Sequence, residues 1–206
     1  MTVGVTGPFA SGKSTFVRML GELGAETASS DEIVHGLLTE DEKTIRRVTE
    51  RFGEGVRGER GIDRRALARE VFGDSRALSD LEEILHPRVR EATDARISAS
   101  SAAVFVAEVP LLFEVGRGED FDLTVAVVTP EERRRAWSEE RGLDEARRRS
   151  SEARQFTPDE KARRADIVVQ NDGDREALRE RAVAVLEKVS RDGSDGGGDL
   201  REQQEQ

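Results

Sequence analysis

Apolar residues in this chain form short continuous runs that alternate with longer stretches of helical spacing. Five of the runs predict β-strands, at residues 2–6, 25–28, 102–110, 122–130 and 165–173. Strands that are apolar on both faces are typical of a parallel sheet covered by helices. The pattern therefore predicts an α/β fold with a parallel five-stranded sheet flanked by helices, and a loop at Ser29, Ser30 and Asp31 after the second strand.

Helical spacing follows the first strand at residues 13–24 and then fills most of the interval before the third. Amphipathic helices are predicted at residues 41–53, 63–73, 74–87 and 88–100, with Gly, Asp or Pro between them. Two charged helices, 131–141 and 143–154, follow the fourth strand, and a last helix covers 175–191. A helical block that interrupts an α/β order indicates an inserted substrate-binding domain.

These elements give a domain plan. Residues 1–31, 102–130 and 162–191 are expected to form the core, and residues 32–101 an inserted helical domain. Residues 131–161 form an Arg-rich region suited to a mobile lid that closes over a transferred phosphoryl group. The Gly- and acid-rich tail, residues 192–206, is expected to be disordered.

Charge and composition exclude several classes. The net charge of −10 argues against broad binding of nucleic acid or anionic membranes, so neither is expected as a partner. The chain has no cysteine, which excludes disulfides and thiolate metal sites. Neither a signal-peptide pattern nor an apolar run of membrane-spanning length is present, so a cytoplasmic location is expected.

The most informative motif is Gly7-Pro8-Phe9-Ala10-Ser11-Gly12-Lys13-Ser14, which fits G-x-x-x-x-G-K-[ST] between a strand and a helix. Such a loop directs backbone N–H groups at phosphates, and the helix N-terminus adds partial positive charge. Lys13 can reach the β- and γ-phosphates, and the Ser14 hydroxyl can bind Mg²⁺. The other interpretation is an ordinary strand-to-helix turn. Pro8 and Ala10 stand where many such loops have glycine, which predicts a stiffer loop.

Several classes of phosphate-loop protein do not fit. The chain has no guanine-reading N-K-x-D and no transporter signature. Glu108, at the end of the third strand, is either part of a second nucleotide motif or a carboxylate at the edge of the sheet. The size, the helical insertion and the arginines after residue 130 favour a small-molecule kinase.

Ordered motifs then show a family resemblance that runs from residue 1 to about 187. They are the phosphate loop, the segment that ends at Asp31, "FGEGV…GIDRRALAREVFGD", "LEEILHPRV", "VPLLFE" at 109–114 and "RQFTPDEKARRADIVVQNDG" at 154–173. In this order they resemble the dephospho-CoA kinase family, whose fold is that of a P-loop kinase. The resemblance implies ATP-dependent phosphorylation of the ribose 3′-hydroxyl of dephospho-CoA, with Mg²⁺ as cofactor.

The resemblance also implies site residues. Asp31, Lys13 and Arg141 would be catalytic, and Asp31 would also bind the acceptor. The nucleotide would contact Ala10, Ser11, Gly12, Lys13, Ser14, Thr15 and Asn171, while Arg64, His86 and Glu114 would contact the acceptor. The residues themselves leave other roles open: Asp31 as a helix N-cap, His86 as a structural side chain, and Arg64 or Arg65 as part of a solvated helix face.

Two departures from the family pattern remain. The lid arginines have shifted spacing, so Arg141 is the first lid candidate and Arg135 the second. Ser29 stands where the family has an aspartate. The alternatives are therefore another small-metabolite kinase of nucleoside or sugar-acid type, or a nucleotide-binding regulator without activity. A monomer or a weak homo-oligomer is expected.

Overall fold

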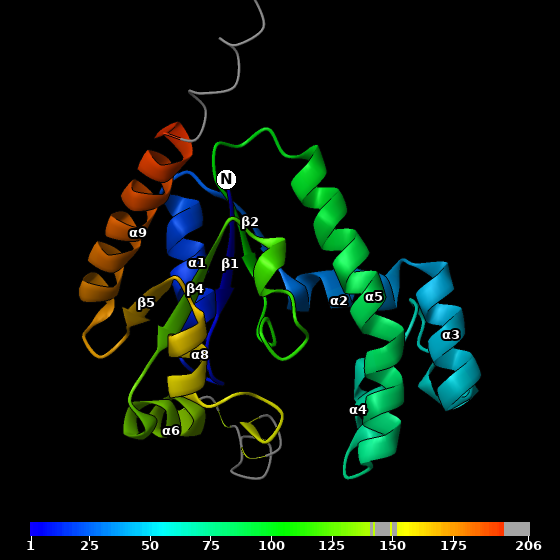
Figure 1. Cartoon of the computed structure of the whole chain (residues 1–206). Coiled ribbons are helices and arrows are strands. Elements are labelled where there is room, and N and C mark those ends of the chain that lie inside the picture. The colour runs from blue at the N-terminus through cyan, green and yellow to red at the C-terminus, as the bar shows by residue number, and fades with distance from the viewer. Residues whose placement is uncertain (141, 143–148, 150–151, 196–206) are drawn as a thin grey trace, which may run out of the picture. The chain divides into compact units, whose positions relative to one another are not determined.

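The computed structural model describes residues 1–140, 142, 149 and 152–195, and the chain divides into two compact units (Figure 1). The sheet unit comprises Met1–Thr27 and Ser100–Gln206, and the helical unit comprises Ala28–Ala99. In chain order the elements are β1 (Thr2–Thr6), α1 (Lys13–Glu22), β2 (Glu26–Ser29), α2 (Ser30–Thr39), α3 (Glu42–Phe52), α4 (Arg64–Val71), α5 (Ser75–Ala99), β3 (Phe105–Glu108), β4 (Leu123–Val128), α6 (Glu131–Glu140), α8 (Pro158–Arg164), β5 (Ile167–Gln170) and α9 (Arg175–Asp195).

The five strands form one sheet in the order β2-β3-β1-β4-β5. β1 pairs in parallel with β3 on one side and with β4 on the other, and β4 pairs in parallel with β5. The Glu26 N–H donates to the Val104 carbonyl over 3.0 Å at the other edge. β1 is therefore the central strand, and the predicted α/β fold with a parallel five-stranded sheet is confirmed.

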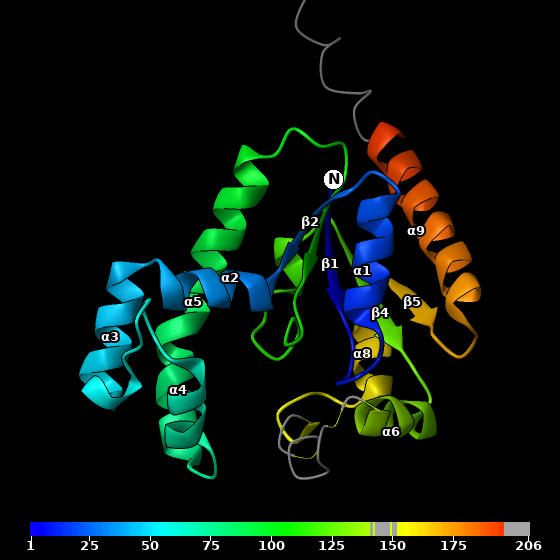
Figure 2. The same ribbon diagram turned by 180° about the vertical axis from the view of Figure 1, so that it is seen from behind.

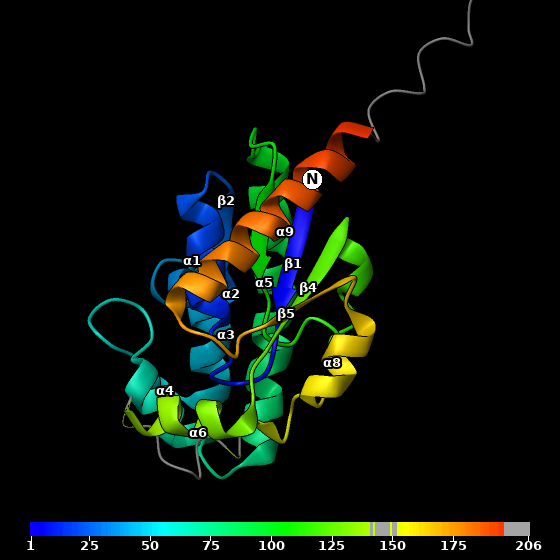
Figure 3. The same cartoon turned by 90° about the vertical axis from the view of Figure 1, so that its left-hand side faces the viewer.

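One face of the sheet is covered by α1 and α9, as Figure 3 shows. Alternate residues of a strand point to opposite faces, so Val3 and Val5 of β1 face the same way. Both are at most 1% exposed, and they share one apolar cluster with side chains of the two helices. Fully burying a side chain of this size stabilises the fold by about 1.5–3 kcal/mol. The cluster therefore fixes α1, and with it the loop that precedes it, against the sheet.

The opposite face is packed differently. A Cβ atom on Gly4, in the middle of β1, would lie 2.8 Å from the Phe121 ring and 3.2 Å from the Leu112 side chain. Glycine at this position therefore lets two large side chains pack directly on the central strand. α8 packs on β4 on this face and carries Lys161, whose ammonium group reaches Thr6 at the end of β1. The face thus holds a buried charge next to the start of the phosphate loop.

The helical unit is built on α5, against which α2, α3 and α4 pack (Figure 2). Two of its helices, α3 and α4, begin after aspartate N-caps: Asp41 accepts from the Thr44 N–H over 2.8 Å, and Asp63 accepts from the Arg65 N–H over 2.8 Å. Such N-caps each contribute about 1 kcal/mol. A separate apolar core holds the unit together; it comprises Leu38, Ile45, Val48, Val56, Ile62, Leu67 and Ile84.

One prediction in this unit was wrong. The sequence predicts two helices that meet at Pro87, whereas α5 runs through Pro87 without ending. A proline inside a helix removes one backbone hydrogen bond and costs about 3 kcal/mol. Here Pro87 is exposed, Ile84 is buried before it, and Thr93 is buried after it. Packing on both sides of the proline therefore outweighs the lost hydrogen bond.

Two boundary predictions also change. The loop expected at Ser29–Asp31 is absent from this stretch, because β2 ends at Ser29 and α2 begins at Ser30. The tail was expected to be disordered from residue 192, but α9 continues to Asp195. Residues 196–206, and most of the helix predicted at 143–154, lie outside the described residues. The helix predicted at 131–141 is α6, which ends at Glu140.

Candidate active site

The segment between β1 and α1 forms a tight loop that leads into the helix N-terminus. Gly7 has φ 153° and Gly12 has φ 85°, in the range that favours glycine. A Cβ atom on Gly7 would also lie 2.2 Å from the Val127 carbonyl oxygen, so no other residue fits there. The first N–H groups of α1 have no acceptor within the helix and carry partial positive charge. This is the arrangement in which helix N-termini bind phosphate.

Pro8 and Ala10, the unusual residues of the loop, differ in what they do for its shape. The Pro8 carbonyl accepts from the Ser11 N–H over 3.2 Å and from the Lys13 ammonium group over 2.9 Å. Ala10 has φ 58°, a left-handed conformation that costs a non-glycine residue about 1–2 kcal/mol. Pro8 restricts the loop through its fixed φ and its doubly bonded carbonyl, whereas Ala10 adopts a conformation that is costly for alanine.

Ser14, the last residue of the motif, is bonded to the third strand. Its hydroxyl donates to Glu108 Oε1 over 2.8 Å. Glu108 ends β3 and is only 6% exposed, whereas Ser14 is exposed. The sequence left Glu108 open between a nucleotide motif and an edge carboxylate. β3 lies beside the central strand, so Glu108 is a buried carboxylate that contacts the phosphate loop directly.

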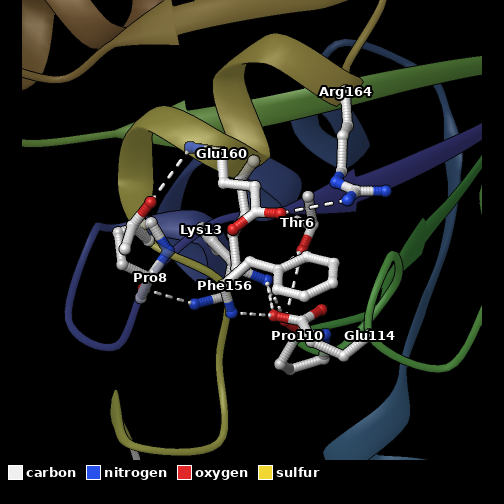
Figure 4. Close-up of polar contacts among 10 residues, drawn as sticks. Thr6, Pro8, Lys13, Pro110, Glu114, Phe156, Glu160 and Arg164 are labelled. Atoms are coloured by element: carbon white, nitrogen blue, oxygen red, sulfur yellow. Dashed lines mark hydrogen bonds and ion pairs between the residues drawn. The ribbon is translucent and has the colours of Figure 1, made fainter.

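A second polar cluster lies at the end of β1, directly before the phosphate loop (Figure 4). Lys161 of α8 is 0% exposed, and its ammonium group has three acceptors. They are Glu114 Oε1 at 2.7 Å, the Pro110 carbonyl at 2.8 Å and the Thr6 hydroxyl at 3.2 Å. The Thr6 hydroxyl in turn donates to the Pro110 carbonyl over 3.1 Å. Every ammonium proton of Lys161 is therefore used inside the protein.

Burial and pairing act on Lys161 in opposite directions. Burial lowers the pKa of the Lys161 ammonium group, and the hydrogen bond and charge of Glu114 partly restore it. Glu114 Oε1 also accepts from the Phe156 N–H over 2.7 Å. The other carboxylate oxygen, Oε2, is buried and has no partner among the described residues. Glu114, predicted to bind the acceptor, thus has one oxygen committed to the fold and a second, buried oxygen without a partner among the described residues.

Asn171 lies directly behind the phosphate loop. Its amide Nδ2 is buried and donates to the Ser11 carbonyl over 2.9 Å. The Thr129 hydroxyl donates to the same carbonyl over 2.8 Å. Of the residues predicted to bind nucleotide, the structure therefore gathers those at 10–15 and Asn171 into one cluster, with Asn171 bonded to the loop backbone.

The region predicted to form the lid contains a buried arginine that the sequence did not single out. Arg134 of α6 is 5% exposed, and its Nη1 donates to the Phe9 carbonyl of the phosphate loop over 3.4 Å. The same nitrogen is paired with Glu152. Arg135, the second lid candidate, is exposed on α6. Arg141, the first candidate, lies outside the described residues.

The remaining predicted residues belong to the helical unit. Asp31 is exposed in the first turn of α2; the N-cap of that helix is Ser29, so the N-cap alternative for Asp31 was wrong. Arg64 is exposed and begins α4. His86 is exposed on α5, where partial desolvation lowers the pKa of its imidazole, so the neutral form predominates at pH 7.

A parallel sheet whose central strand ends in a glycine loop, followed by a buried lysine and a serine bonded to a buried carboxylate, defines a P-loop enzyme of the kinase type. A model of the dephospho-CoA kinase family matches residues 1–177. The chain belongs to this family. Among solved structures, the Thermus thermophilus protein TT1252 matches with a TM-score of 0.76 and 34% identity, over 91% of this chain and 97% of that one.

Relatives that are named as dephospho-CoA kinases support the same family. The dephospho-CoA kinase of Syntrophotalea carbinolica is 36% identical over 194 residues, covering 92% of each protein. That of Protochlamydia amoebophila is 39% identical over 177 residues, covering 83% of this chain and 87% of the relative. The structure of the Campylobacter jejuni enzyme matches with a TM-score of 0.63 and 25% identity, over 92% of this chain and 97% of that one. A shikimate kinase from Acinetobacter baumannii, 16% identical with a TM-score of 0.55, shares the fold alone.

Family membership gives the activity. The chain is a kinase of the last step of coenzyme A synthesis, with ATP and dephospho-CoA as its substrates. In the part of the chain that the structure describes, no helix is long and apolar enough to span a membrane.

Proposed function

We propose that the loop at residues 7–14 holds the phosphates of ATP and that Asp31 receives the proton of the ribose 3′-hydroxyl as the phosphoryl group is transferred to it. The carrying observation is the loop itself, in which two glycines of positive φ lead into the N-terminus of α1. The backbone N–H groups of Ala10, Gly12 and Thr15, together with the side chains of Lys13 and Ser14, would bind the nucleotide, and the Ser11 N–H, which donates to the Pro8 carbonyl, would shape the loop around it.

Lys13 is the cation of this site. Its ammonium group donates to the Pro8 carbonyl, and the residue as a whole is 8% exposed. A phosphate oxygen is a stronger acceptor than a carbonyl, because the hydrogen bond is then charge-assisted. We expect Lys13 to leave Pro8 for the β- and γ-phosphates when ATP binds and to stabilise the charge that develops during transfer.

The residues present also fit Mg²⁺. The Ser14 hydroxyl and the Glu108 carboxylate are hard oxygen donors, joined by a hydrogen bond at the end of the phosphate loop. Mg²⁺ keeps several waters and is usually bound by one or two protein groups plus the phosphates of the substrate. Ser14 would hold the ion and Glu108 would orient the hydroxyl. When bound, the ion would neutralise charge on the β- and γ-phosphates.

On the acceptor side, the transfer forms one bond and breaks one. The ribose 3′-oxygen attacks the γ-phosphorus, the bond from that phosphorus to the bridging oxygen breaks, and ADP leaves with the bridging oxygen. The hydroxyl proton passes to the Asp31 carboxylate, which is exposed and has no partner among the described residues. Arg64, His86 and Glu114 Oε2 would contact the acceptor, and Arg141 would close on the transferred group as part of the lid.

Asp31→Asn tests the acceptor side, with Glu32→Gln as a matched control because Glu32 is exposed in the same turn. We expect Asp31→Asn to lower kcat about 10²- to 10⁴-fold, because the base is lost, and to leave the Kd for ATP within about twofold. Glu32→Gln should leave both unchanged. Turnover by Asp31→Asn within about threefold of the unaltered enzyme would show that the carboxylate is not the base.

A further inference from the structure

The peptide group between Ser11 and Gly12 in the phosphate loop accepts hydrogen bonds from residues at the ends of two strands. The Ser11 carbonyl accepts from the Thr129 hydroxyl over 2.8 Å and from Asn171 Nδ2 over 2.9 Å. Thr129 directly follows β4, and Asn171 directly follows β5. Both donors are nearly buried, at 5% and 4% exposed, and both lone pairs of the carbonyl oxygen are therefore used without water.

The two donors are themselves fixed. The Asn171 backbone N–H donates to the Val128 carbonyl over 2.7 Å, which ties the end of β5 to the end of β4. β4 is in turn paired with β1, from which the loop departs. The loop is therefore anchored to the strand that begins it and, through Ser11, to the next two strands of the sheet.

The position of this carbonyl decides the direction of the next N–H group. In a planar trans peptide the C=O and N–H point in opposite directions. Two donors that draw the Ser11 oxygen toward β4 and β5 therefore turn the Gly12 N–H toward the other side, into the loop. Gly12 has φ 85°, and glycine allows the peptide to rotate to other orientations at little cost. A stable orientation thus needs an external restraint.

Asn171 also fits against Gly12 by shape. A Cβ atom on Gly12 would lie 2.4 Å from Asn171 Nδ2, closer than any real contact. The amide therefore packs on the bare Cα of Gly12 while it bonds to the carbonyl that precedes it. This explains why position 12 must lack a side chain in this chain beyond the requirement for positive φ.

We propose that Thr129 and Asn171 are positioning residues for the phosphoryl donor: they hold the Ser11–Gly12 peptide in the orientation that directs its N–H at a phosphate oxygen. This inference rests on the proposed nucleotide site at residues 7–14. It changes the role expected for Asn171, whose amide acts through the loop backbone rather than on the nucleotide.

The test uses Thr129→Val, Thr129→Ser, Asn171→Ala and the double variant Thr129→Val/Asn171→Ala. Thr93→Val is the matched control, since Thr93 is 1% exposed and its hydroxyl donates to the Val89 carbonyl over 2.7 Å in the helical unit. For each purified protein the Kd for Mg·ATP, the KM for ATP, the KM for dephospho-CoA and the Tm are measured.

Each single loss leaves one donor on the carbonyl, so we expect the Kd for ATP to rise about three- to tenfold. The double variant leaves a buried carbonyl without a donor and a peptide free to rotate, so its Kd should rise by more than the product of the single effects. Thr129→Ser keeps the hydroxyl and should stay within about twofold. The KM for dephospho-CoA should not change, and Thr93→Val should lower the Tm without weakening ATP binding.

The outcomes separate the two claims. If the unaltered protein does not bind Mg·ATP, the proposed nucleotide site fails. If it binds but the double variant binds within twofold of it, the positioning role fails. A Kd that follows the Tm in all variants, Thr93→Val included, would likewise show a purely structural role and overturn the inference.

Discussion

The buried pair of Lys161 and Glu114 offers a prediction whose size can be worked out from the structure. Lys161 is 0% exposed, and the Glu114 side chain is 10% exposed. Lys161→Met removes the cation and leaves the Glu114 carboxylate buried, with only the Phe156 N–H as a donor among the described residues. Breaking a buried ion pair in this way costs about 3–5 kcal/mol. For a protein of this size that corresponds to a fall in Tm of roughly 6–20 °C.

Removing both charges should be much milder. In Lys161→Met/Glu114→Gln the glutamine Oε1 can still accept from the Phe156 N–H, and the Thr6 hydroxyl can still donate to the Pro110 carbonyl. No uncompensated charge remains, and replacing a buried pair by neutral groups is often close to neutral. We therefore expect the double variant to recover most of the stability that Lys161→Met loses.

Activity should not recover with stability. Glu114 is proposed to contact the acceptor through Oε2, so the double variant should keep a raised KM for dephospho-CoA, about tenfold or more, while its KM for ATP changes little. Arg117→Met is the matched control, because Arg117 pairs with Asp120 over 2.7 Å and its side chain is 7% exposed. That variant should lose stability without changing either KM.

Thermal unfolding and steady-state kinetics are measured for the unaltered protein, Lys161→Met, the double variant and Arg117→Met. A double variant no more stable than Lys161→Met would refute the argument that the orphaned carboxylate causes the loss. A double variant with both stability and the KM for dephospho-CoA restored would show that Glu114 serves the fold alone.

Two further predictions concern Glu108 and Asp41. Glu108→Gln keeps an acceptor for the Ser14 hydroxyl but removes a charge, so the Mg²⁺ concentration for half-maximal rate should rise about tenfold at saturating ATP; an unchanged Mg²⁺ titration would contradict the proposed role. Hydrogen bonds from Thr44 lower the pKa of Asp41 below 3.8, with a smaller contribution from Arg88. Asp41 therefore stabilises the folded state at pH values above its pKa in the unfolded chain. This stabilisation is lost as the pH falls through its lower pKa in the folded protein. Urea unfolding between pH 7 and pH 2.5 should show that Asp41→Asn lacks this acid-dependent loss, and an identical slope in both proteins would contradict the assignment.

The fold could be predicted from the sequence because its core follows simple periodicity. The apolar runs of β1, β3 and β4 are buried on both faces, as in a parallel sheet covered by helices, whereas β5 at the edge of the sheet leaves Val168 40% exposed. α1 has a buried apolar stripe at helical spacing and ends at Glu22, two residues before the predicted end. Pro87 was misjudged because local propensity ends a helix there, while the packing that sustains α5 comes from residues distant in sequence.

The polar part of the site was harder to predict for a physical reason. Lys161 and Arg134 are buried charges, and hydrophobic periodicity treats charged residues as exposed. In α6 the buried positions are Arg134 and Ser138, four residues apart, so the inward face of this helix has no apolar signal. Their partners lie far away in sequence, at Phe9 and Glu152 for Arg134. Only the fold brings such groups together.

The phosphate loop shows the opposite case. Its motif is local, so residues 7–14 could be assigned from spacing alone. The bonds that support it are not local: Glu108 ends β3, and Thr129 and Asn171 directly follow β4 and β5. A motif can therefore identify what the loop binds, but not what holds it in shape.

The most direct test of the central claim is a coupled assay of ADP formation by the full chain with Mg·ATP and dephospho-CoA. We expect ADP to form only when dephospho-CoA is present, in a one-to-one ratio with a product that carries one new phosphate on the ribose 3′-oxygen. Equal ADP formation without dephospho-CoA, or far faster turnover of a nucleoside, gluconate or shikimate, would contradict the account.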